Sequence, residues 1–98
     1  MALVKKGSRT ITVGEIDYRW LVSAQDMEGL GLVIELAEKP RQRMVTWFEH
    51  GDVISPSVVE RCIKFALAND WHPESTGSEL HFRHNGAMDG LLSRITPR

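Results

Sequence analysis

The chain has 98 residues, of which 42% are hydrophobic and 26% are charged, and its formal net charge at pH 7 is -1. This composition predicts one soluble globular domain at residues 1–98, with a loose start at 1–7, a core at 8–84 and a tail at 85–98. The near-neutral charge makes a nucleic-acid partner unlikely. No apolar run approaches the roughly 20 residues that span a bilayer, so we expect a protein that binds no membrane. The lone Cys62 excludes an internal disulfide, which indicates a cytoplasmic protein.

The first predicted element is a β-hairpin whose strands span residues 9–13 and 16–22, where polar and apolar side chains alternate. Gly14 opens the two-residue loop between these strands, and glycine at that position favours a type II′ turn. Pairing through this turn places Ile11 opposite Tyr18 on one face of the sheet.

A third strand at residues 30–37 and a fourth at 42–49 are separated by a break at Pro40, which cannot donate to a strand ladder. Pairing around this break aligns Leu32 with Trp47. A β-bulge would exchange the two faces of the fourth strand, which carries apolar side chains on both of them.

The strongest helix signal lies within residues 54–73. Ser55 is a suitable N-cap, followed by Pro56 at the first helical position, and a capping box that begins at Ser57 is the alternative start. Asn69 tolerates the left-handed conformation that often closes a helix. The apolar arc of this helix comprises Val58, Val59, Cys62, Ile63, Phe65, Ala66 and Leu67.

A short fifth strand is predicted at residues 79–83, from the alternation of its apolar side chains. In the tail at 85–98, helical spacing relates Met88, Leu91, Leu92 and Ile95, although Gly90 weakens the pattern. The tail is therefore either a short helix or frayed.

Three segments carry a resemblance to known sequences: YRW at residues 18–20, SPSVV at 55–59 and FALANDWHP at 65–73. The chain resembles a group of short, uncharacterised bacterial proteins over about residues 7–83. In that group the same hairpin precedes one helix that ends in a glycine-tryptophan turn and a proline, and Asp70 stands here at the glycine position. The resemblance implies a bacterial source and a shared fold, and it transfers no activity.

No catalytic constellation stands out in the sequence. His81 and His84 are three residues apart on a predicted strand, so their side chains point to opposite faces and cannot share a metal ion. Cys62 lies on the apolar arc of the helix, where cysteine usually behaves as a small buried hydrophobe. We therefore expect no catalytic residue, no metal site, no cofactor and no enzymatic activity.

The predicted fold class is α+β, with a five-stranded antiparallel sheet in the chain order β-β-β-β-α-β and one main helix packed on one face. The order across the sheet would be fourth, third, second, first and fifth strand. The expected core consists of Ile11, Val13, Ile16, Tyr18, Trp20, Leu32, Ile34, Trp47, Val59, Cys62, Ile63, Ala66 and Leu80.

One helix is about 10–12 Å wide and five strands span about 20 Å, so apolar side chains of the sheet are left uncovered. This favours a non-enzymatic protein-interaction module that forms a homodimer or binds another protein partner. The alternative is a nucleic-acid or small-ligand binding protein, in which Trp20 or Trp47 would supply a stacking surface. Basic residues would line one end of the first hairpin (Lys5, Lys6, Arg9 and Arg19) and the next turn (Lys39, Arg41 and Arg43). The candidate interface residues are Leu21, Val33, Met44, Phe48, Met88, Leu91, Leu92 and Ile95.

Overall fold

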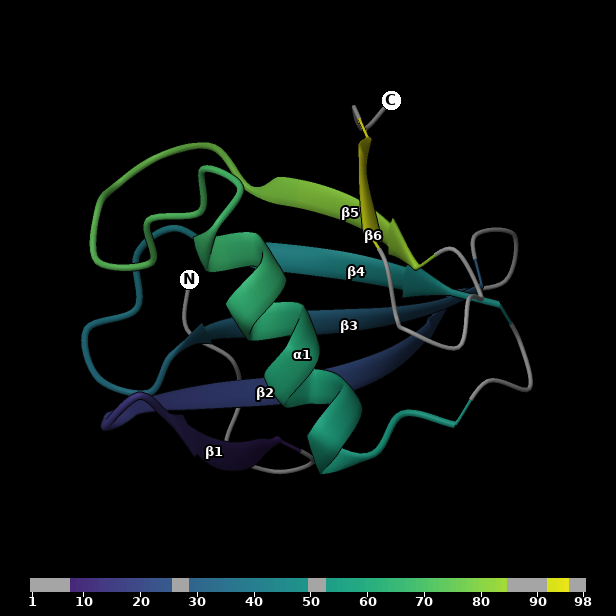
Figure 1. Cartoon of the computed structure of the whole chain (residues 1–98), viewed down its shortest axis with the longest axis horizontal. Coiled ribbons are helices and arrows are strands. Elements are labelled where there is room, and N and C mark those ends of the chain that lie inside the picture. Colours follow the sequence, from purple (N-terminus) through teal and green to yellow (C-terminus); the bar gives the residue numbers. More distant parts are fainter. Residues whose placement is uncertain (1–7, 26–28, 50–52, 85–91, 96–98) are drawn as a thin grey trace.

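The structure is a computed structural model that describes residues 8–25, 29–49, 53–84 and 92–95. One helix lies diagonally across one face of a six-stranded sheet, which confirms the α+β class (Figure 1). In chain order the elements are β1 (Arg9–Val13), β2 (Ile16–Gln25), β3 (Gly29–Leu36), β4 (Met44–Phe48), α1 (Pro56–Leu67), β5 (Leu80–His84) and β6 (Leu92–Ile95).

The strands lie in the sheet in their chain order, β1 to β6, and all neighbours are antiparallel except β4 and β5, which are parallel. The prediction that the fifth strand lies antiparallel beside the first is therefore wrong. The segment after α1 is tied to the start of β4 instead, because Gln42 N donates to Ser75 O at 3.0 Å and Leu80 N donates to Arg43 O at 3.0 Å. These bonds deliver β5 to the β4 edge.

Neither alternative for the tail, a short helix or a frayed end, holds for residues 92–95, which form β6 and pair with β5, so the sheet extends beyond the predicted core at 8–84. The outer edge of β5 offers a row of backbone donors and acceptors, and pairing satisfies them. Met88 and Leu91 lie outside the described residues.

The first hairpin has the predicted register, with Ile11 opposite Tyr18 and Val13 opposite Ile16. Its turn is of type I′ and not II′, because both loop residues have positive φ, 59° at Gly14 and 67° at Glu15. A glutamate in this region is unfavourable, since its Cβ crowds the backbone.

The register between β3 and β4 differs by one residue from the prediction: Leu32 lies opposite Thr46, and not opposite Trp47. As a result Met44 and Phe48 face α1 and belong to the core, whereas Trp47 lies on the other face. The connection at residues 37–43 contains Lys39 in the left-handed region, with φ 50°. The paired residues of β3 and β4 are centred on Lys39, and not between Lys39 and Pro40 as predicted. This is the exchange of faces that the sequence analysis gave as the alternative.

The ends of α1 follow local sequence signals. Ser55 is the N-cap, as predicted, and its Oγ accepts from Val58 N at 3.4 Å. At the other end the left-handed residue is Asp70, with φ 75°, and not Asn69. Asn69 instead donates through Nδ2 to Phe65 O at 2.8 Å, which satisfies a carbonyl of the last turn.

The core lies between α1 and the sheet, and most of the predicted core residues are buried there. Ile16 is an exception with 48% of its surface exposed, because it begins β2 beside the turn, and Ile11 is only partly buried. Trp71, which was not among the predicted core residues, is 1% exposed and packs against Tyr18 with ring centroids 5.7 Å apart.

Candidate functional site

The face of the sheet opposite α1 is called the open face here, because α1 is the one described helix and it lies on the other side (Figure 1). The strand registers bring Leu21, Val33, Val45 and His81 into one row across β2 to β5. Leu21 and Val33 are half-buried, and Val45 is only 4% exposed. The three apolar residues of this row therefore expose little surface and do not form a broad apolar patch.

The indole of Trp47 lies over Gly31 in the next row of the open face. A Cβ added at Gly31 would stand 3.1 Å from Cζ3 of the indole, so the ring occupies the space that a side chain would fill. The other end of the indole is held by a hydrogen bond of 3.1 Å from Trp47 Nε1 to His81 Nδ1. Both contacts fix the ring.

A polar chain continues from His81 along the open face. His81 Nε2 lies 2.9 Å from Glu79 Oε1, and Arg43 Nε lies 3.5 Å from Glu79 Oε2 and 3.9 Å from Glu35 Oε1. Since Nδ1 of His81 already accepts the indole N–H, its proton lies on Nε2 and points to Glu79. Both ring nitrogens of His81 are thus engaged, one by Trp47 and the other by Glu79.

The predicted interface is only partly on the open face. Met44 and Phe48 are buried on the α1 side, 0% and 3% exposed, because the β3–β4 register differs by one residue from the prediction. The structure places Leu92 and Ile95 in β6, at the edge of the sheet beside β5. The exposed apolar surface that motivated a face-to-face dimer is correspondingly smaller.

The other candidate groups for chemistry are separated from one another. His81 and His84 point to opposite faces, as predicted, since His84 stacks on Phe48 of the core with ring centroids 4.7 Å apart. Cys62 is buried beside Thr46, and this burial raises the pKa of its thiol to about 11. Within the described ranges, no group of three or more His, Cys, Asp or Glu residues could hold a metal ion.

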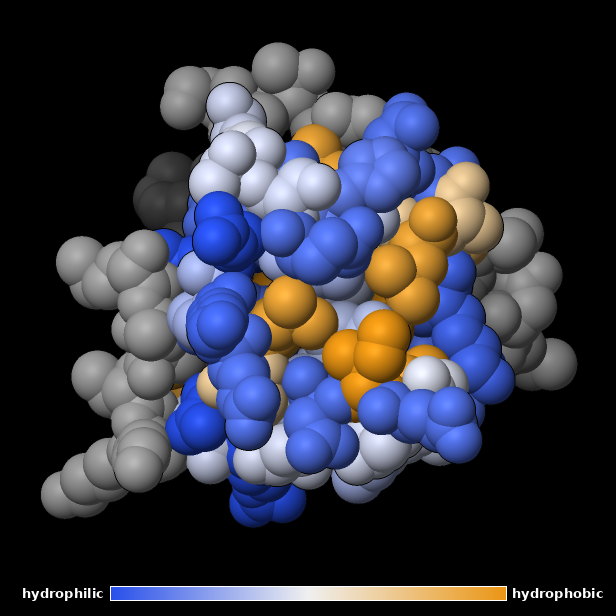
Figure 2. Space-filling model, turned by 90° about the vertical axis from the view of Figure 1, so that its left-hand side faces the viewer, coloured by the Kyte–Doolittle hydropathy of each residue, from blue (hydrophilic) through white to orange (hydrophobic). Residues whose placement is uncertain are grey.

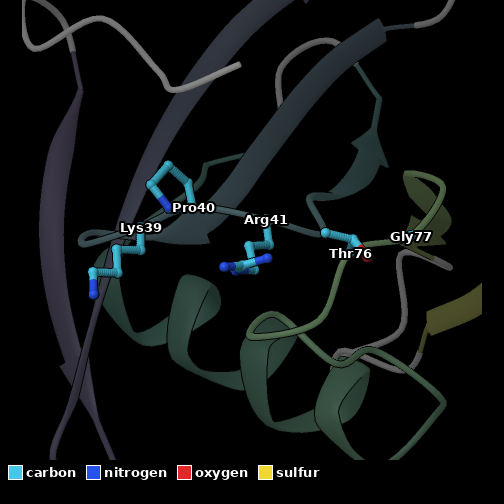
Figure 3. Close-up of a pocket in the computed structure, with 5 residues that line it drawn as sticks. All are labelled: Lys39, Pro40, Arg41, Thr76 and Gly77. Carbon is cyan, nitrogen blue, oxygen red and sulfur yellow. The ribbon is translucent and has the colours of Figure 1, made fainter.

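A hollow of about 450 Å³ lies between the β3–β4 connection and the loop before β5 (Figure 3). It is lined by Lys39, Pro40, Arg41, Thr76 and Gly77. The charged ends of Lys39 and Arg41 are exposed and do not converge on one point with the Thr76 side chain (Figure 3). The hollow therefore lacks the convergent polar groups of a small-ligand site.

The structure also separates the residues of the predicted stacking surface. Trp20 is 5% exposed and lies on the α1 side, so it cannot stack on a base. Trp47 lies on the open face, but Arg43, just before β4, is paired with acidic groups. Figure 2 shows the end of the molecule that carries the β1–β2 turn, and its apolar atoms form small patches separated by hydrophilic residues.

The outer edge of β1 is a candidate binding site that was not among the sites predicted from the sequence. Among the described strands β1 is the terminal one and pairs with β2 alone, and Thr10 and Thr12 are exposed there. The strand-forming residues of β1 were recognised, but the predicted strand order placed β5 beside them. With β5 next to β4, none of the described strands other than β2 pairs with β1.

Comparison of the chain with protein-family models, with curated proteins and with solved structures finds no match. Among the described residues, no helix is long and apolar enough to cross a membrane.

Proposed function

We propose that this protein is a non-enzymatic interaction module that binds an extended protein segment along the outer edge of β1. The observation that carries the proposal is the terminal position of β1, whose outer edge pairs with no described strand. A strand added there would hydrogen-bond to the backbone, a common mode of peptide recognition.

The hairpin geometry identifies the outward backbone groups. In a two-residue hairpin the flanking residues, Val13 and Ile16, form a hydrogen-bonded pair, and such pairs alternate along the strands. Thr12 and its partner Asp17 therefore form a non-hydrogen-bonded pair. Asp17 O accepts from Ala37 N at 3.0 Å, on the β3 side, which agrees with this alternation. The N–H and C=O groups of Thr12, and likewise of Thr10, point away from the sheet.

The edge carries one charged side chain, Arg9 at its start, and otherwise lacks the features by which proteins usually block strand addition. β1 has the sequence RTITV, without proline, lysine or glycine, and its register with β2 is continuous over all five residues. Natural edge strands are commonly protected by lysine, proline or a bulge. Threonine, isoleucine and valine also favour the extended conformation that a partner strand needs.

A test uses Thr12→Pro, which removes an outward N–H without removing a bond of the β1–β2 ladder. Nine-residue peptides that bind the wild-type protein are first selected from a random display library. Their affinity for Thr12→Pro should be at least tenfold lower than their affinity for wild type. The matched control is Thr12→Val, which keeps the N–H and a β-branched side chain and should bind within about threefold of wild type.

Circular dichroism and a urea melt confirm that both variants are folded. Selected peptides that bind Thr12→Pro as tightly as wild type would contradict the proposal, as would a library that yields no binder.

A further inference from the structure

We infer that the strand that occupies this edge is β1 of a second copy of the chain, so that two sheets join at their β1 edges into a homodimer. This inference rests on the proposed function, because it names the partner of the same edge. It is supported by the register in which the outward-pointing backbone groups of two β1 strands can pair.

The outward backbone groups belong to Thr10 and Thr12, so an antiparallel second β1 must place its own Thr10 and Thr12 opposite them. The register centred on Ile11 pairs Thr10 with Thr12 of the second copy and Ile11 with its equivalent. It also pairs Arg9 with Val13 of the second copy. This register uses all five residues of β1, whereas registers centred on Thr10 or Thr12 pair fewer of them.

The side chains suit this register on both faces. On the α1 side the two copies of Ile11, each only partly buried in one chain, come into contact, and this increases the buried apolar area. Arg9 lies opposite Val13 and not opposite another arginine, so like charges do not meet across the seam. On the open face Thr10 lies opposite Thr12, a favourable cross-strand pair.

A second copy is favoured over an unrelated peptide because the edge is self-complementary. The two-fold axis through Ile11 runs perpendicular to the sheet, so the contact is isologous and closed and cannot extend into a fibre through β1. It also removes the one feature of β1 that would otherwise promote indiscriminate strand addition. The contact is narrow, one strand on each side, and we expect a weak dimer that dissociates on dilution.

Sedimentation over a hundredfold range of protein concentration tests the dimer. Wild type should associate, and the dissociation constant of Thr12→Pro should be at least tenfold higher than that of Thr12→Val, which keeps the outward N–H and loses the same hydroxyl. The double variant Thr10→Lys with Thr12→Lys places four lysines where the two β1 strands meet, and it should be monomeric. This variant keeps the inference testable even if Thr12→Pro fails to fold.

Amide hydrogen exchange then locates the contact. The exchange of the Thr10 and Thr12 amides should slow by at least tenfold at high protein concentration, while inward amides such as that of Ile11 change little. Association that survives in the double-lysine variant would overturn the inference, as would a wild type that stays monomeric throughout. In the latter case peptides that bind the edge would still support the proposed function, so the two can fail separately.

Discussion

Cys62 and Tyr18 show how burial sets the chemistry of individual residues. Burial raises the pKa of the Cys62 thiol to about 11, from 9.0, although Thr46 and Arg61 act in the opposite direction. Burial also raises the pKa of Tyr18, and the charge of Glu74 adds to this effect. Both groups are held in their neutral forms, which suits packing roles and not nucleophilic chemistry.

The Cys62 thiol predicts a loss of stability in alkaline solution. Because the pKa is higher in the folded state, the folded protein keeps a proton that the unfolded chain releases above pH 9. The stabilising contribution is therefore complete below pH 9 and is lost as the pH rises toward 11, by roughly 2–3 kcal/mol. Urea melts between pH 8 and pH 11 measure the free energy of unfolding.

The control for this effect is Cys62→Ala, whose stability should fall less over the same pH range. A smaller fall in the same direction is still expected, because the pKa of Tyr18 is also raised. A Cys62→Ala variant with the full wild-type slope would assign the effect to other groups.

Among the elements, those with strong local signals were predicted well. The start of α1 is fixed by Ser55 and the hairpin register by the two-residue loop, and both signals lie within a few residues of the structure they determine. The turn type was missed because glycine first in the loop suits both I′ and II′. The difference depends on whether Glu15 adopts positive φ, which its side chain disfavours.

This conflict predicts that the turn can be improved. Gly14→Asn together with Glu15→Gly creates the residue pair that type I′ turns prefer, and Glu15 is exposed, so little contact is lost. We expect the free energy of unfolding to rise by about 1 kcal/mol. Gly14→Ala, which puts a Cβ at φ 59°, should lower it by about 1–2 kcal/mol. Urea melts that show the double variant to be less stable than wild type would exclude a type I′ turn.

On the scale of the whole molecule, Gln42 joins the start of β4 to the segment that follows α1. Its backbone N donates to Ser75 O, and its backbone O accepts from Trp71 Nε1 at 3.0 Å. Its side chain accepts from His72 N and donates to Ser78 O, each at 2.9 Å. All four polar groups of one residue thus hold the loop that leads to β5.

Gln42→Ala should therefore cost roughly 1–3 kcal/mol, since two side-chain hydrogen bonds are lost and their partners are left without them. Gln42→Glu is the matched variant, because it keeps the acceptor for His72 N and loses the donor to Ser78 O, and it should fall between Gln42→Ala and wild type. Urea melts followed by tryptophan fluorescence measure both. A cost below about 0.5 kcal/mol for Gln42→Ala, the size of an ordinary surface effect, would show that the loop is held by other contacts.

Such long-range ties explain what could not be predicted from the sequence. The apolar alternation of residues 79–83 predicted a strand, but the partner of that strand depends on Gln42, which lies 37 residues before Glu79. The β3–β4 register depends on the path of a seven-residue connection, residues 37–43, and no short motif defines that path. The candidate site followed from the strand order, so it was missed for the same reason.

The parallel pairing of β4 and β5 also has a consequence for how the chain folds. The loops that close the first three ladders contain two, three and seven residues, whereas 31 residues, 49–79, separate β4 from β5. Closing the long connection costs roughly 2.4 kcal/mol more chain entropy than closing the first turn. We therefore expect the β1–β4 meander to assemble first from local contacts, and β5 and β6 to join it after α1 has packed and brought its C-terminal end to β4. In the reverse direction we expect β5 and β6 to detach first, and native-state hydrogen exchange of their amides measures this.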